Sequence, residues 1–194
     1  MRYGHRAVTI LLGLSAQLLA GCAPTPPGPQ SIAPEQSIVR LPAELARARL
    51  AVRRQVERGF LQERVVLGND TAVAGENAIV VQTQWRGDPF YVFKSGRFAN
   101  PYTETSIDRR VADEFAGWQV SPPMERINDH GRYRYIEAAD EGVRCVLAWQ
   151  MVDAMAALTG EVDTYAVDFR FCDTRRDVEA LLALFDELEL QPYL

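Results

Sequence analysis

The sequence predicts an α+β domain with a mainly antiparallel sheet, segregated helices and an amphipathic C-terminal helix. Most of the chain after the N-terminal region consists of short apolar runs with strand-like alternation. Helical patterns are few, and they do not alternate regularly with the strands as a parallel arrangement would require. This part of the chain has about 150 residues, which suits one domain with a normal core.

The N-terminal region resembles a bacterial lipoprotein signal. Arg2 and Arg6 precede a mostly apolar run over residues 7–20, which is shorter than a typical membrane span of about 20 residues. The run ends in the sequence LAGC at residues 19–22, which resembles the lipobox of lipoprotein precursors. Small residues stand before the cleavage point and a thiol follows it. The alternative is an ordinary secretory signal with a cysteine placed there by chance.

We therefore expect residues 1–21 to be a signal peptide and Cys22 to become the lipidated N-terminus. Stable attachment needs more than one acyl chain, which a mature lipoprotein has. The domain would then lie in the periplasm. Ala23 stands where lipoproteins retained in the inner membrane often carry Asp, which favours sorting to the outer membrane.

Residues 22–41 are predicted to form the lipidated cysteine and a proline-rich tether, which leaves residues 42–194 as a single domain. The prolines of this segment are Pro24, Pro26, Pro27, Pro29 and Pro34. An extended polyproline chain rises about 3.1 Å per residue, so the tether would reach roughly 50 Å from the membrane.

The charge balance makes nucleic acid an unexpected partner. The chain has 21 basic and 26 acidic residues, and its net charge is −5. Loss of Arg2 and Arg6 with the signal peptide changes this charge by two, to −7. A phosphate backbone would repel a domain of this charge.

The first half of the domain combines one expected helix with two strands. Pro42 is a favourable first helical position, and a thin apolar stripe predicts a helix over residues 42–56. Strand patterns follow at residues 61–67 and 78–85, separated by a segment rich in turn residues. A further short run at residues 90–93 is expected to extend the sheet.

The middle of the domain predicts a second helix, with Thr105-Ser106 as its cap. Its apolar positions recur at spacings of four, four and three, which places them on one helical face. These positions are Ile107, Val111, Phe115 and Trp118. Pro122-Pro123 ends this region.

The last third predicts two strands and a closing helix. Strongly β-like runs occupy residues 143–152 and 164–172, after Tyr133 and Tyr135. Thr174 is expected to cap the final helix, with Asp177 near its N-terminus. The apolar face of this helix consists of Val178, Leu181, Leu182, Phe185 and Leu188.

Two cysteines remain once Cys22 is lipidated, and both would face an oxidising compartment. A disulfide between Cys145 and Cys172 is therefore expected. Strand parity argues partly against it: if both apolar strand faces pack into one core, the two sulfurs start on opposite sides of the sheet. A bulge, or departure of Cys172 from the strand end, would bring them together. Two buried free thiols are the alternative.

Catalytic signals are weak, and we expect neither an enzyme nor a bound cofactor or metal. His130 lies in the sequence NDHG, which predicts a surface turn. The sequence shows no nucleophile elbow, no zinc-ligand spacing and no glycine-rich phosphate loop. Carboxylate pairs suited to glycosidase chemistry exist, but solvated surface is the favoured interpretation. These pairs are Asp140 with Glu141 and Asp168 with Asp173.

Several aromatic residues could stack on sugar rings if their side chains were exposed. They are Trp85, Tyr91, Tyr102, Trp118 and Trp149. Trp118 and Trp149 lie on apolar stripes, so we expect them in the core. Trp85 and Tyr91 do not lie on such a stripe, so they are the candidates for glycan binding; packing of both side chains in the core is the alternative.

Four segments together resemble the BcsN family of cellulose biosynthesis lipoproteins of alphaproteobacteria. Residues 63–70 (ERVVLGND) and 75–81 (GENAIVV) resemble the first hairpin of that family. Residues 145–150 (CVLAWQ) and 169–172 (FRFC) resemble its paired cysteine strands, ahead of a closing amphipathic helix. The resemblance is discontinuous and spans roughly residues 60 to 188.

The resemblance implies an accessory component of cellulose or related exopolysaccharide production and export, with no family active site to transfer. Its partners would be cellulose-synthesis or export components, or the glycan itself. The alternative from a different class is a lipoprotein that binds a protein partner in another envelope or secretion assembly. A periplasmic glycan hydrolase is the weakest hypothesis.

Overall fold

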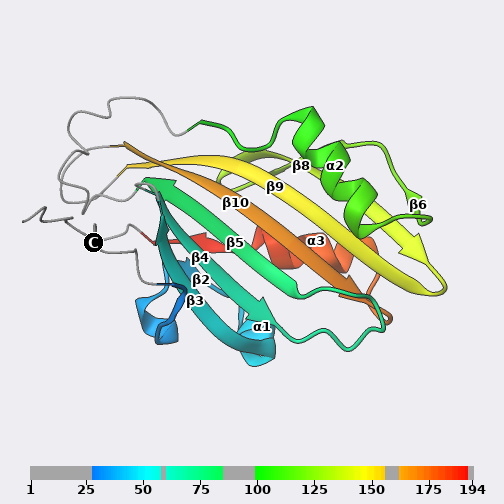
Figure 1. Cartoon of the computed structure of the whole chain (residues 1–194), viewed down its shortest axis with the longest axis horizontal. Helices are drawn as coiled ribbons and strands as arrows, with labels where there is room; N and C mark the ends of the chain where they lie inside the picture. Colours follow the sequence, from blue (N-terminus) through cyan, green and yellow to red (C-terminus); the bar gives the residue numbers. More distant parts are fainter. Residues whose placement is uncertain (1–27, 58–59, 85–98, 156–161, 192–194) are drawn as a thin grey trace, which may run out of the picture.

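A computed structural model describes residues 28–57, 60–84, 99–155 and 162–191, and strands dominate these residues (Figure 1). The strands are β1 (Gln30–Ser31), β2 (Val39–Arg40), β3 (Arg49–Glu57), β4 (Phe60–Leu67), β5 (Asn77–Gln84), β6 (Gln119–Val120), β7 (Met124–Asn128), β8 (Gly131–Asp140), β9 (Val143–Met155), β10 (Val162–Asp173) and β11 (Glu189–Leu190). The helices are η1 (Pro34–Gln36), α1 (Ala43–Ala48), α2 (Glu104–Glu114) and α3 (Val178–Asp186).

One nine-stranded antiparallel sheet organises the molecule. Its strand order is β1-β3-β4-β5-β10-β9-β8-β6, and β7 also pairs with β8. A separate two-stranded sheet joins β2 to β11. Every pair is antiparallel, and the helices stand apart from the strands, so the predicted α+β class is confirmed.

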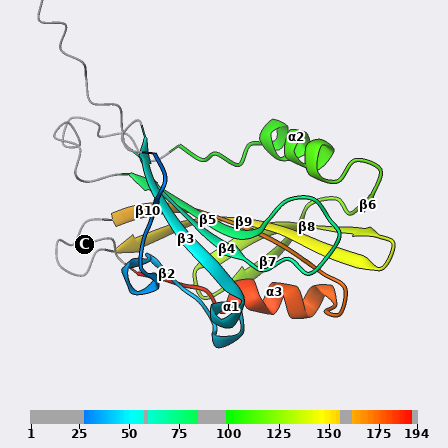
Figure 2. The same ribbon diagram turned by 60° about the horizontal axis from the view of Figure 1, so that its bottom comes forward.

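The large sheet is covered on both faces. Figure 2 shows α2 on one side of the sheet and α3 with α1 on the other. We call these the α2 face and the α3 face. The buried core of the α3 face includes Val65, Ile79, Val81, Val146, Ala148, Val167, Phe169, Phe171, Leu181 and Phe185. The core of the α2 face consists of Ile107, Phe115, Ile136, Ala138, Cys145, Leu147, Trp149 and Cys172.

This division explains how Cys145 and Cys172 meet. Their strands pair in continuous register, with Cys172 directly opposite Cys145 and no bulge between them. The structure joins them by a disulfide, with the two Cα atoms 4.0 Å apart. The assumption of a single core was wrong: β9 sends Leu147 to the α2 face, whereas β10 sends Phe171 to the α3 face. Both sulfurs therefore lie on the α2 face, and strand parity never opposed the bond.

The Asn77 side chain takes the place of a backbone partner for Cys172. Its amide donates to the Cys172 carbonyl at 3.0 Å and accepts from the Cys172 N–H at 2.8 Å, and Asn77 itself is buried. The backbone groups of Cys172 thus point towards β5, which makes Cys145 and Cys172 a non-hydrogen-bonded pair. Such pairs are the closer of the two antiparallel types, which suits a cross-strand disulfide.

The helix expected over residues 42–56 is only half present. It ends at Ala48, and Arg49–Glu57 forms strand β3, which pairs along β4. The apolar stripe was thin, with Val52 as its one buried position beyond the helix. Backbone pairing with an existing strand outweighs such a weak helical preference, because tertiary contacts override propensity.

Residues 30–41, which we assigned to the tether, form part of the folded domain. β1 pairs with β3, and β2 pairs with β11. Ile38 and Val39 are buried in the α3-face core. The anchor is Glu63, a fully buried carboxylate that accepts from the Ser37 hydroxyl at 2.8 Å and from the Ile38 N–H at 2.9 Å. The proline-rich composition concealed these two short strands.

Two helix caps lie a few residues from their predicted positions. Thr103, and not Thr105-Ser106, caps α2 by accepting from the Ser106 N–H at 3.2 Å. Asp177, and not Thr174, caps α3 by accepting from the Ala180 N–H at 2.8 Å. In both helices a short polar side chain satisfies an otherwise unpaired N–H of the first turn.

Candidate functional site

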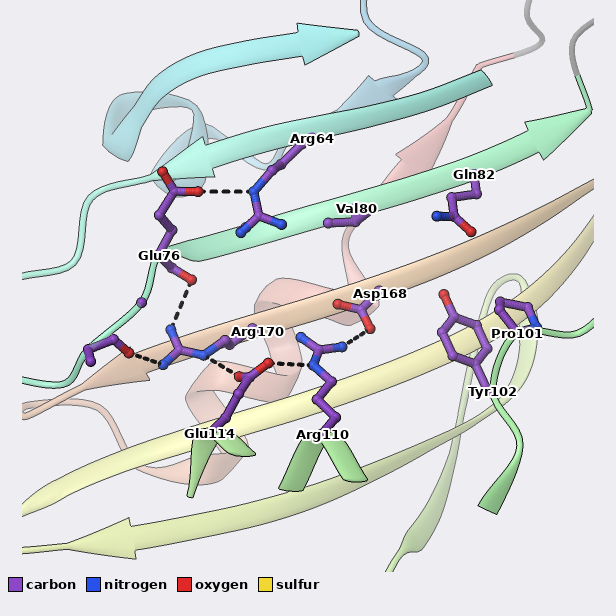
Figure 3. Close-up of a pocket in the computed structure, with 13 residues that line it drawn as sticks. Arg64, Glu76, Val80, Gln82, Pro101, Tyr102, Arg110, Glu114, Asp168 and Arg170 are labelled. Carbon is purple, nitrogen blue, oxygen red and sulfur yellow. Dashed lines mark hydrogen bonds and ion pairs between the residues drawn. The ribbon is translucent and has the colours of Figure 1, made fainter. Parts of the chain in front are cut away.

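A polar cleft opens on the α2 face of the sheet, beside α2. It has a volume of about 460 Å³ and lies between α2, the segment before it and strands β4, β5 and β10. We define the cleft by its lining residues, Arg64, Ala74, Gly75, Glu76, Ala78, Val80, Gln82, Pro101, Tyr102, Arg110, Glu114, Asp168 and Arg170. Figure 3 shows these side chains.

The Arg170 side chain is held by hydrogen bonds on three sides. It is buried, and its Nε donates to Glu114 of α2 at 2.7 Å. Its two terminal nitrogens donate to the carbonyls of Glu76 and Ala74, at 2.9 and 2.8 Å. All three hydrogen-bonding branches of the guanidinium are therefore occupied, and they tie β10 to α2 and to the β4–β5 loop.

Gly75 lets the β4–β5 loop close around Arg170. Its φ of +95° is one that residues with a side chain rarely adopt. A Cβ at this position would lie 3.3 Å from an Arg170 nitrogen. The glycine therefore permits both the turn and the close approach of the guanidinium to the flanking carbonyls.

A chain of charges links α2 to the sheet (Figure 3). Arg110 donates to Glu114, one helical turn along, at 2.6 Å and also forms an ion pair with Asp168 of β10. Glu114 therefore bridges Arg110 and Arg170. The spacing of four residues places Arg110 and Glu114 on one side of α2. Ion pairs from these two residues to Asp168 and Arg170 hold this side of the helix on β10.

The opposite wall comes from β4 and β5. The Arg64 Nε donates to Glu76 at 3.0 Å, and Val80 lies between this pair and Gln82 along β5. Among the described residues, neither the Gln82 amide nor the Tyr102 hydroxyl has a hydrogen-bond partner. Both groups point into the space beside Asp168 in Figure 3, so they are available to a ligand.

Burial raises the pKa values of two acidic groups in the cleft. It raises the pKa of Asp168 above the ordinary value for aspartate, although the Arg110 guanidinium opposes this shift. Burial, and then the charge of Asp168, raise the pKa of the Tyr102 phenol. The Tyr102 hydroxyl therefore stays protonated at neutral pH and can both donate and accept a hydrogen bond.

The carboxylates singled out from the sequence do not form a glycosidase pair. Asp168 is buried in the cleft on the α2 face, whereas Asp173 is buried on the other side of β10, paired with Arg176. We expected both carboxylates to be solvated, and this was wrong. Both are buried, and each is paired with an arginine. Asp140 and Glu141 are exposed beside the β8–β9 turn.

His130 lies in the predicted turn, between β7 and β8, and contacts the segment that follows α3. Its Nε2 is 2.9 Å from the Leu188 carbonyl, which gives the ring a structural partner. Trp149 is buried in the α2-face core, and Trp118 packs against that core. Cys22, Trp85 and Tyr91 lie outside the described residues, as do the signal peptide and the run at residues 90–93.

Within the ranges that the structure describes, no group of three or more His, Cys, Asp or Glu side chains could hold a metal ion. No helix in these ranges is long and apolar enough to cross a membrane.

Sequence reasoning considered Tyr102 and Asp168 but missed Arg110, Glu114 and Arg170. One signal was present, since Arg110 and Glu114 stand four residues apart on the expected helix. A second was the polar parity of the strand at residues 164–172, where Asp168 and Arg170 alternate with apolar neighbours. Nothing in the sequence indicates that these two patterns face one another.

These features define a disulfide-linked antiparallel α+β domain with a charge-balanced cleft on one face. A family model described as "Cellulose biosynthesis protein BcsN" matches residues 40–194. The chain therefore belongs to the BcsN family of cellulose biosynthesis proteins, and the resemblance noted in the sequence is confirmed over a wider range. No curated protein and no solved structure matches the chain.

Proposed function

We propose that this protein is a non-catalytic accessory lipoprotein of cellulose biosynthesis, which acts on the passage or assembly of the glucan after polymerisation. Cys22 anchors it by lipid, in the outer membrane, and its domain lies in the periplasm. The observation that carries the proposal is the family match over residues 40–194. The lipobox-like sequence at residues 19–22 supports the anchor.

The chemistry of the chain supports an accessory role. The sequence contains no phosphate-binding glycine-rich loop, and a periplasmic domain has no access to nucleotide sugars. In the cleft each carboxylate is paired with an arginine: Asp168 with Arg110, Glu114 with Arg110 and Arg170, and Glu76 with Arg64. Carboxylates held in this way favour binding over general acid and base catalysis.

Gene deletion tests the proposal. The deletion strain should make less cellulose, or less ordered fibres, while isolated membranes transfer glucose from a nucleotide sugar at the parental rate. Complementation with the wild-type gene is the control. Normal amounts of normal fibres in the deletion strain would contradict a role in cellulose production. A matching loss of glucosyl transfer in isolated membranes would contradict action after polymerisation.

A further inference from the structure

We infer that the cleft beside α2 binds a short segment of an uncharged β-linked glucan chain. The inference rests on the proposed function for the identity of the glucan, and on the described residues of the cleft for the rest. The groups that would contact the sugar are the Tyr102 ring and hydroxyl, the Gln82 amide and the polar edges of Arg64, Arg110 and Asp168.

The dimensions of the cleft suit a small segment of a polymer. Its volume of about 460 Å³ falls within the range of roughly 300–1,000 Å³ that is usual for small-ligand sites. Ala78 and Val80 place short apolar side chains on the β5 side, and Pro101 adds another apolar surface beside Tyr102. The rest of the lining is mostly polar, so these small apolar surfaces would contact the C–H faces of a sugar ring while the polar groups meet its hydroxyls.

The charge of the cleft favours a neutral ligand. Three guanidiniums and three carboxylates line it, so the charges balance. They are Arg64, Arg110 and Arg170 with Glu76, Glu114 and Asp168. A site for a phosphorylated or acidic sugar would need an excess of positive charge, because a buried anion must be paired. Planar amide, carboxylate and guanidinium groups instead offer the hydrogen bonds that sugar hydroxyls require.

Two polar groups lack the partners that a sugar would supply. The Gln82 amide and the Tyr102 hydroxyl make no hydrogen bond to any described residue, although each is partly shielded from solvent. The ion pairs of Arg110 hold the Asp168 carboxylate in place beside them. Because Arg110 and Asp168 are already oriented, their contribution to binding would cost little side-chain entropy.

The test uses the full-length protein purified in detergent and titrated by calorimetry with cellotetraose. Binding of cellotetraose should be measurable. Tetragalacturonate, a charged chain of the same length, and maltotetraose, an α-linked one, should bind at least about tenfold more weakly, since unpaired charge and altered shape each cost more than one hydrogen bond. Equal binding of tetragalacturonate would overturn the charge argument. Equal binding of maltotetraose would overturn the assignment to a β-linked glucan.

Variants locate the site. Tyr102→Phe and Gln82→Ala should each weaken cellotetraose binding about two- to tenfold, which is the expected effect of one hydrogen bond. Gln119→Ala is the matched control, because Gln119 is exposed on β6, away from the cleft. Unchanged near-ultraviolet circular dichroism would show that the variants fold. Wild-type affinity in both folded cleft variants would overturn the inference.

Failure of this inference can be separated from failure of the proposed function. If cellotetraose does not bind but the deletion strain loses cellulose, the cleft assignment is wrong and the accessory role stands. If cellotetraose binds as expected but the deletion strain makes normal cellulose, the proposed function fails and the binding site stands.

Discussion

Glu63 is the residue whose replacement tests the fold most directly. Its carboxylate is fully buried in β4 and holds residues that precede α1. One oxygen accepts from the Ser37 hydroxyl and the Ile38 N–H, and the other pairs with Arg54. The Ser37 hydroxyl in turn accepts from the N–H of Val39, the first residue of β2, at 3.1 Å. Glu63 therefore orients the hydroxyl that binds the start of β2.

We expect Glu63→Ala to lower the free energy of unfolding by about 3–5 kcal/mol. The substitution leaves the buried Ser37 hydroxyl and Ile38 N–H without an acceptor, at about 1–3 kcal/mol each. The loss of the ion pair adds less, because the Arg54 side chain is 22% exposed and keeps the Gln36 carbonyl as a partner. Glu63→Gln should cost less than Glu63→Ala, since its amide oxygen can still accept.

Urea unfolding and amide hydrogen exchange measure the effect. Exchange at Ile38 should accelerate in Glu63→Ala because its amide loses its buried acceptor, and exchange at Val39 should accelerate because the Ser37 hydroxyl that accepts from it is no longer oriented by Glu63. Glu35→Ala is the control, since Glu35 is exposed in η1 of the same segment. A free energy of unfolding within about 1 kcal/mol of the wild type, together with a protected Ile38 amide, would contradict this role of Glu63.

Three further predictions concern the sulfurs and their surroundings. Replacing Cys145 and Cys172 together with Ala should lower the free energy of unfolding by about 3 kcal/mol, since the bond closes a sequence separation of 27 residues; two free thiols in denatured, unreduced protein from the periplasm would exclude the bond itself. Asn77→Ala should cost about 2–3 kcal/mol in urea unfolding, because two buried hydrogen bonds to Cys172 are lost; an unchanged midpoint would show that water replaces the amide. Cys22→Ser should abolish lipidation, and mass spectrometry of membrane-extracted wild-type protein should find a modified Cys22 at the N-terminus.

Much of the fold could be predicted because alternation records burial residue by residue. The strands at residues 143–152 and 164–172 and the last helix have strong apolar patterns, and all three are present. The same alternation was harder to interpret where both faces are buried. Cys172 looked misplaced only because one core was assumed, whereas Leu147 and Phe171 serve different cores.

The failures share a physical cause, which is pairing between distant segments. Residues 49–57 become a strand because β4 offers them backbone partners, and residues 39–40 do so because β11 returns to them. The cleft has the same origin: Arg110 and Asp168 are far apart in sequence and meet only when α2 lies on β10. A local pattern can show that a side chain is polar but cannot show what it faces.

The small sheet of β2 and β11 has a consequence for the order of folding. It pairs Val39 with Leu190, and the Gln191 N–H donates to the Ile38 carbonyl at 2.8 Å. These residues are separated by about 150 positions, so the pair closes a very long loop and can form only after the last strand has been synthesised. β2 therefore stays unpaired, without its partner strand, until the C-terminal end of the domain is present.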